Sequence, residues 1–84
     1  MKVEPELEQT LKRAPQDNVA VIVHVQGDPA LYAESIESLG LSVERVFRLT
    51  NTLAVRGAAS GVLELADRPW VEKIEPDRQI TTQR

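Results

Sequence analysis

The sequence predicts an α+β domain in which two helices cover one face of a four-stranded antiparallel sheet, behind a short N-terminal helix. Two observations lead to this class. One β-branched, strongly apolar segment, residues 19–25, has the composition of a central strand. Strand-like and helix-like segments alternate along the chain as β-α-β-β-α-β, and Gly or Pro stands at most of their ends. This order is that of the ferredoxin-like sandwich, which leaves the second face of the sheet open.

Residues Val19 to Val25 carry the strongest strand signal. The segment VAVIVHV holds four valines and one isoleucine and contains no Gly, Pro or formal charge. β-Branched residues favour a packed, pleated surface. Because side chains alternate between faces, the four valines should lie against the core, and Ala20, Ile22 and His24 should face a partly covered side. A strand this apolar is expected to be central, since an exposed edge would promote aggregation.

The chain before this strand is expected to form a peripheral helix over residues 4–13. Pro5 suits a first helical turn, and Pro15 should end the helix. Its apolar residues recur every four positions and form one narrow stripe: Val3, Leu7 and Leu11. The chain thus divides into a helix and linker (1–17), the sandwich (18–77) and an extended C-terminal tail (78–84).

The first helix of the sandwich is expected over Pro29–Leu39. Asp28 is a candidate N-cap, with Pro29 at the first helical position. Gly40 can supply the left-handed residue that ends a helix. The predicted buried face consists of Tyr32, Ile36 and Leu39.

A hairpin is expected next, from residues 41–49 and 53–56. Thr50-Asn51-Thr52 is a candidate tight turn, although a longer loop is also compatible, and Gly57 should break the second strand. The first strand would place Val43, Phe47 and Leu49 on one side and Val46 on the other. The second would place Leu53 and Val55 inward.

The last two elements are a helix from Ser60 to about Arg68 and a strand over Trp70–Glu75. Ser60 is the candidate N-cap, and the helix should bury Val62, Leu65 and Ala66. The strand's apolar residues, Val71 and Ile74, are three apart, which predicts a β-bulge. Pro76 is expected to end the pairing.

Composition argues against several functional classes. The net charge is −3, the ten basic residues are dispersed and only three residues are aromatic, which disfavours a nucleic-acid partner. Without cysteine there is neither a disulfide framework nor thiolate chemistry. No apolar run approaches the ~18 residues of a spanning helix, and the N-terminal residues lack the apolar core of a signal peptide. We therefore expect no membrane partner.

Candidate catalytic groups are scarce, so we expect a protein that is not an enzyme. His24 is the single histidine, and a surface or hydrogen-bonded role explains it. The carboxylates and His24 do not have metal-ligand spacing. The glycine-containing segments GDPA and GAASG lack the lysine and the spacing of a phosphate loop. Neither a catalytic residue, a metal nor a cofactor is expected.

The second half of the chain resembles the propeptides of subtilisin-like serine proteases and the free-standing inhibitors related to them. The ending P-x-V-x-x-I-E-x-D is its most specific part, and VAVIVHVQG is similar to the family's opening strand. The likeness covers residues 19–84, whereas the helix over 4–13 and the short turn at Asn51 depart from the pattern. The residues that carry it are Gly40, Val43, Phe47, Leu53, Val55, Leu65, Pro69, Val71, Ile74, Glu75 and Asp77.

The resemblance implies binding to a subtilisin-like serine protease. The open sheet face would dock on two parallel helices of the protease, with Glu75 and Asp77 at their N-termini, where exposed amides attract anions. The tail would lie in the active-site cleft as an added strand. Gln83 would enter the specificity pocket, with Thr82 and Arg84 as alternatives. The tail residues in contact would be Ile80, Thr81, Thr82, Gln83 and Arg84.

A domain of this family would act as an inhibitor, as an intramolecular chaperone for its protease, or as both, and would be a monomer when free. It would be secreted with its protease if it is a propeptide, and cytoplasmic if it is a free-standing inhibitor without a leader. Under the simpler interpretation, Glu75 and Asp77 are solvated carboxylates and the tail is a frayed terminus.

Two other classes are compatible with the predicted fold. One is a non-catalytic regulatory or assembly module that binds a small ligand or pairs edge strands into a dimer. The other is an acylphosphatase-like enzyme, which would need an anion-binding arginine beside a catalytic asparagine. Arg48, Arg56 and Asn51 are its candidates, but no phosphate-cradling loop precedes the first helix.

Overall fold

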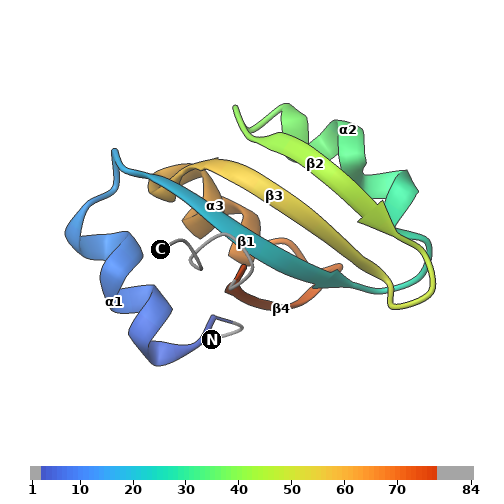
Figure 1. The fold of residues 1–84 in the computed structure, drawn as a ribbon, viewed down its shortest axis with the longest axis horizontal. Helices are drawn as coiled ribbons and strands as arrows, with labels where there is room; N and C mark the ends of the chain where they lie inside the picture. Colours follow the sequence, from blue (N-terminus) through green and yellow to red (C-terminus); the bar gives the residue numbers. More distant parts are fainter. Residues whose placement is uncertain (1–2, 78–84) are drawn as a thin grey trace, which may run out of the picture.

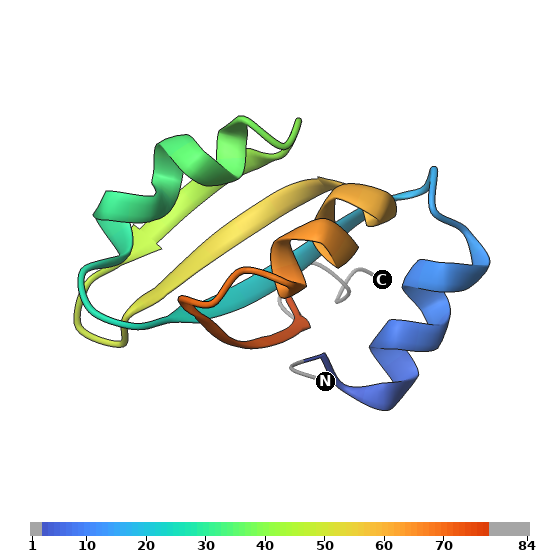
Figure 2. The same ribbon diagram turned by 180° about the vertical axis from the view of Figure 1, so that it is seen from behind.

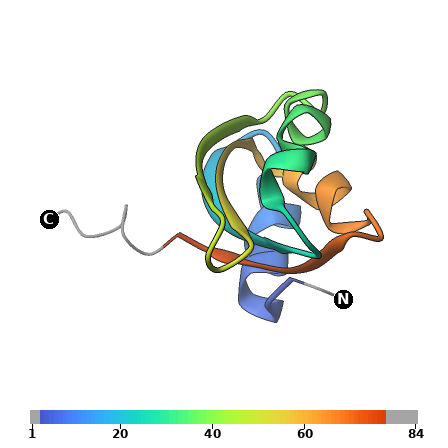
Figure 3. The same cartoon turned by 90° about the vertical axis from the view of Figure 1, so that its right-hand side faces the viewer.

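The computed structural model describes residues 3–77 and confirms the predicted α+β class (Figure 1). Its sheet is antiparallel, with the strand order β2-β3-β1-β4 expected of a ferredoxin-like sandwich. Helices α2 and α3 cover one face, as the views from behind and along the sheet show (Figures 2 and 3). The elements are α1 (Pro5–Arg13), β1 (Asn18–Val25), a 3-10 helix (Pro29–Tyr32), α2 (Ala33–Glu37), β2 (Ser42–Phe47), β3 (Thr52–Ala58), α3 (Ala59–Ala66) and β4 (Val71–Pro76).

Strand β1 is central, as its composition predicts. It pairs with β3 on one side and β4 on the other. Val21, Val23 and Val25 are buried, whereas Ile22 and His24 on the opposite face are half-buried. The odd-numbered residues of β1 therefore lie against the helices, and the even-numbered ones face the open side of the sheet.

Helix α1 belongs to the core, so the expectation of a peripheral helix is wrong. Leu11 is fully buried, and Leu7 and Val3 are buried with it in the main hydrophobic cluster. The helix packs against α3, and Val3 forms a parallel bridge with Ile74 on the outer edge of β4. A narrow apolar stripe is sufficient to attach this helix to the core, because all three of its residues pack against other apolar residues.

The N-terminus of α3 is not capped by Ser60, contrary to expectation. The helix begins at Ala59 and has no side-chain cap. Its first amides instead donate to carbonyl oxygens of the loop between α1 and β1, Ala59 to Asp17 and Ser60 to Pro15, each at 2.9 Å. A backbone segment distant in sequence thus satisfies two of the unpaired donors of this helix end. The predicted buried residues Val62, Leu65 and Ala66 are confirmed.

The chain between β1 and β2 forms two short helices rather than one continuous helix. The Asp28 carboxylate accepts a hydrogen bond from the Ala30 amide at 3.0 Å, and Gly40 has φ +85°, so the predicted N-cap and the left-handed glycine are confirmed. The second helix ends at Glu37, two residues before the predicted end at Leu39. The junction falls at Tyr32, whose ring stacks on Trp70 with centroids 4.2 Å apart and whose hydroxyl donates to the Gln26 carbonyl. Ile36 is fully buried.

The β2–β3 hairpin has the longer of the two expected loops, residues 48–51, with Asn51 at φ 56°. A register shift leaves Glu44 unpaired between Val43 and Arg45. This bulge reverses the alternation, so Phe47 lies opposite Thr52 on the open face, not beside Val43 as expected. Leu49 is in the loop and fully exposed.

Strand β3 continues through Gly57 to Ala58, so the expected break there is wrong. A Cβ atom at Gly57 would lie 2.5 Å from Cδ2 of Leu41. Glycine at this position therefore makes room for the buried Leu41 side chain and does not end the strand.

The predicted bulge in β4 is confirmed. Val25 pairs with Val71 and His24 with Lys73, which leaves Glu72 as the extra residue and turns both Val71 and Ile74 inward. Pro76 does not end the pairing, contrary to expectation. It lies opposite Val21, and the Asp77 amide donates to the Ala20 carbonyl at 3.0 Å. Proline is tolerated because β4 is an edge strand.

Candidate functional site

The open face of the sheet, opposite α2 and α3, is the candidate functional site (Figure 3). Directly paired residues on neighbouring strands point to the same face, so the register arranges the side chains in rows. One row contains Arg45, Ala54, Ile22 and Glu75; a second contains Phe47, Thr52, His24 and Lys73; a third contains Ser42, Arg56 and Ala20. Asp77 extends the third row through its hydrogen bond to Ala20.

A shallow groove of about 550 Å³ runs over this face. Its floor is apolar, with Ala20, Ile22 and Ala54 among the lining residues. Phe47 also lines it and is 39% exposed. Such a surface loses water readily when a partner covers it.

His24 and Glu75 form a contact at the β4 side of the face. Nε2 of His24 lies 2.5 Å from Oε2 of Glu75, and each side chain is 32% exposed. The hydrogen-bonded role expected for His24 is confirmed by this contact. The imidazole and the carboxylate restrict each other's orientation, and Glu75 keeps part of its surface open to solvent.

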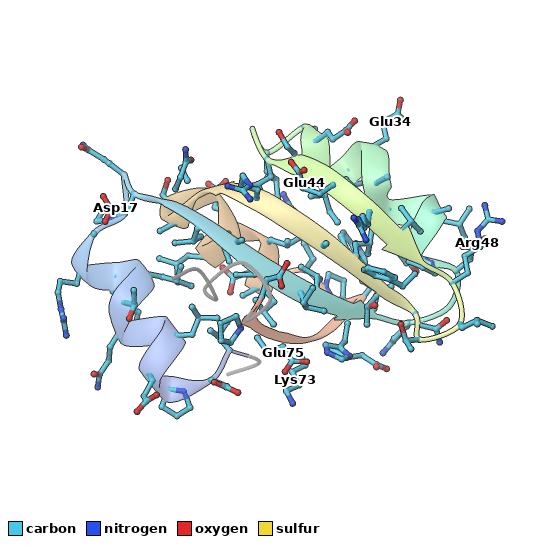
Figure 4. All side chains as sticks on the ribbon, viewed as in Figure 1. Asp17, Glu34, Glu44, Arg48, Lys73 and Glu75 are labelled. Atoms are coloured by element: carbon cyan, nitrogen blue, oxygen red, sulfur yellow. The ribbon has the colours of Figure 1, made fainter. Side chains whose placement is uncertain are left out.

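The structure brings Glu75 and Asp77 together on one border of the groove. Figure 4 labels Glu75, with Lys73 of the same strand near it. Glu75 and Asp77 are two residues apart in extended chain, so both side chains belong to the open face, and both are half-buried. The other predicted protease-binding residues lie outside the described residues: Ile80, Thr81, Thr82, Gln83 and Arg84.

Arg45 and Arg56 line the opposite side of the groove, together with Glu44. Sequence reasoning gave Arg45 no role, and it considered Arg56 only as an anion-binding candidate of an acylphosphatase-like site. Arg56 could have been placed from the alternation of β3, because it is two residues from Ala54. Arg45 could not, because the Glu44 bulge sets the face on which it lies.

The candidate residues of an acylphosphatase-like site are separated. Arg48 and Asn51 belong to the β2–β3 loop, where Nε of Arg48 lies 3.8 Å from Oδ1 of Asp28. Arg56 is near the other end of β3, on the open face. The fold thus does not assemble these three side chains into one anion-binding site.

Within residues 3–77, no group of three or more histidine, aspartate and glutamate side chains is placed to hold a metal ion. Over the same range, no helix has the length and apolar character needed to cross a membrane.

No protein-family model matches the chain, and no curated protein sequence shows significant similarity to it. The fold itself places the chain in the class of ferredoxin-like α+β sandwiches with one open sheet face.

Proposed function

We propose that the domain binds a subtilisin-type serine protease through its open sheet face and inhibits it with the C-terminal tail. By binding the folded protease surface, it can also assist folding of that protease as an intramolecular chaperone. The single observation that carries the proposal is that Glu75 and Asp77 lie together on one border of a groove with an apolar floor. This border is at the end of β4 that leads into the tail. The likeness of the I-E-x-D ending to subtilisin propeptides supplies the class of partner.

The spacing of the two acids suits a pair of helix N-termini. Residues two apart in a strand are separated by about 6.6–6.8 Å, and packed helices lie about 8–10 Å apart. Side chains that diverge slightly can thus reach one helix each. Every N-terminus offers unpaired amides and about half a positive charge, so each carboxylate would gain hydrogen bonds that do not require a basic residue in the partner.

The tail supplies the inhibitory part of the proposal. Ile80 would fill an apolar subsite three residues before Gln83, which would enter the specificity pocket. The segment would be held chiefly by backbone hydrogen bonds, as added strands are. Inhibition then needs only stable docking of the sheet face and slow cleavage of the tail by the protease.

Titration of a subtilisin-type protease with the purified full chain tests this proposal. We expect residual activity on a chromogenic peptide to fall to near zero as the domain is added, with a stoichiometric end point if binding is tight. Trypsin, which has a different fold, serves as the control and should retain its activity. Unchanged subtilisin activity, with no complex detected by gel filtration, would reject the proposal.

The alternative, a module that dimerises by pairing edge strands, receives no specific support from the two edges. On β2, the unpaired Glu44 and the adjacent Arg45 interrupt the pattern that a second strand would need. On β4, Val3 already bridges to Ile74. Both are features that hinder edge-to-edge association.

A further inference from the structure

The open face carries opposite charges at its two sides. Arg45, Ala54, Ile22 and Glu75 form one continuous row across all four strands, in the register of the sheet. Neighbouring strands lie about 4.8 Å apart, so the backbones of Arg45 and Glu75 are separated by about 14 Å. Two apolar side chains occupy the interval. The row therefore presents a cation, an apolar floor and an anion in a straight line.

The adjacent row has the same polarity. Arg56 lies opposite Ala20 on β1, and the Asp77 amide binds the Ala20 carbonyl from the other side. The arginine side thus carries Arg45 and Arg56 with the single carboxylate of Glu44, and the acidic side carries Glu75 and Asp77 with the exposed Lys73 at its far end. Arginines thus outnumber carboxylates on the first side, and carboxylates outnumber the lysine on the second.

Both arginines are exposed, and neither forms an ion pair with another residue of the described chain. In the direction of β4, the directly paired positions are Ala54 for Arg45 and Ala20 for Arg56, and their side chains offer no acceptor. Guanidinium groups bind carboxylates through two parallel hydrogen bonds. The arginine side is therefore well suited to an acidic group on a partner surface.

We infer that the protease surface recognised by this face has two electrostatically different parts. It offers backbone amides where it meets Glu75 and Asp77, and it is acidic where it meets Arg45 and Arg56, about 14 Å away. The inference rests on the proposed function and extends it by specifying a feature of the protease. The two arginines set the orientation of the domain on the protease and hasten its association, since charges at an interface rim act mainly on the association rate. A polyanion such as a nucleic acid fits the face poorly, because Glu75 and Asp77 would repel it.

Charge reversal of the arginines tests the inference. Arg45→Glu and Arg56→Glu should each slow association with a catalytically inactivated subtilisin by about tenfold at low salt, because an attraction is replaced by a repulsion. The effect should shrink as the salt concentration rises. Arg13→Glu, on α1 and outside the groove, changes the net charge equally and should leave the rate within about twofold. Stopped-flow fluorescence gives the rates, and circular dichroism checks that each variant is folded.

A double-mutant cycle then locates the partner group. Acidic residues on the docking surface of the subtilisin are changed to lysine one at a time, and at least one change should restore fast association to Arg45→Glu or Arg56→Glu while slowing that of the unmodified domain. Normal rates for both arginine variants, or coupling to none of the acids, would overturn the inference and leave the proposed function intact. If the unmodified domain fails to bind any subtilisin, the proposed function and the inference both fall.

Discussion

Glu44 and Glu72 each occupy an extra position in a strand, and each reverses the side-chain alternation of the residues that follow. On β2 the reversal places Phe47 and Arg45 on the open face. On β4 it keeps Val71 and Ile74 in the core and directs Glu75 outward. The chemistry of the face thus depends on two bulges, because a one-residue change of register exchanges the two faces of a strand.

The two acids of the open face provide the first prediction at this scale. Glu75→Ala combined with Asp77→Ala should weaken binding to a subtilisin by roughly 3- to 30-fold, since each anion at a helix N-terminus contributes about 0.3–1 kcal/mol. The free energy of unfolding should fall by less than about 1 kcal/mol, because the pair that Glu75 forms with His24 is partly exposed.

Inhibition constants and urea unfolding measure the two quantities. Glu34→Ala combined with Glu37→Ala removes the same charge from α2, on the other side of the sheet, and serves as the matched control. If the Glu75 and Asp77 variant loses its fold but inhibits normally per folded molecule, the two acids are structural and not part of the interface.

Gly57 provides the second prediction. Gly57→Ala should destabilise the domain by about 1–3 kcal/mol, because the added methyl would lie 2.5 Å from the buried Leu41 side chain. Leu41→Ala alone should also be costly, but the double variant should be more stable than the sum of the two losses implies. Urea unfolding of all four proteins measures the coupling; strict additivity would mean that the two residues do not compete for the same space.

At the scale of elements, α1 and the loop after it join parts of the molecule that are distant in sequence. The helix packs on α3, the Pro15 and Asp17 carbonyls accept the first amides of α3, and Val3 bridges the outer edge of β4. Sequence reasoning treated residues 1–17 as separate from the sandwich. The contacts of α1 make it part of the same core, so its removal would expose buried surface of α3 and β4.

The third prediction follows from this packing. Leu11→Ala should lower the free energy of unfolding by about 2–5 kcal/mol, as expected for a fully buried leucine. Leu49→Ala makes the same chemical change at a side chain that is 101% exposed and should alter stability by no more than about 0.5 kcal/mol. Equal effects in thermal or urea unfolding would show that α1 does not contribute to the core.

For the whole molecule, the fold and the proposed inhibition should be separable. Residues 3–77 contain every helix and strand of the described chain, and the tail that would enter the protease cleft follows them. A folded domain that binds through one sheet face can therefore present the tail without depending on it for stability.

The fourth prediction tests this separation. Ile80→Ala should weaken inhibition by about one to two decades, because a fully buried isoleucine contributes about 1.5–3 kcal/mol. Deletion of residues 80–84 should weaken it further and leave the thermal midpoint nearly unchanged. Calorimetry and inhibition assays provide both readouts. If the truncated domain inhibits as well as the full chain does, the substrate-like role of the tail is wrong and only docking through the sheet face remains.

Features that depend on near neighbours in the chain can be predicted from the amino-acid sequence alone. These include the alternation of β1, the Asp28 cap, the left-handed Gly40 and the β4 bulge, which follows from the spacing of Val71 and Ile74. Each of these features is set by the chemistry of a few consecutive residues, so it can be predicted without knowledge of the fold. The placement of Glu75 and Asp77 on one face also follows from their spacing in an extended chain.

Which distant groups meet depends on how the strands and helices pack together. Nothing local to Phe47 or Arg45 places them on the open face, since that depends on the register of β2 against β3. The capping of α3 by Pro15 and Asp17 depends likewise on a loop more than forty residues earlier. The row from Arg45 to Glu75 exists because three strand pairings coincide in register. Pairing between strands joins residues far apart in sequence, and its register is set by the packing of the whole sheet.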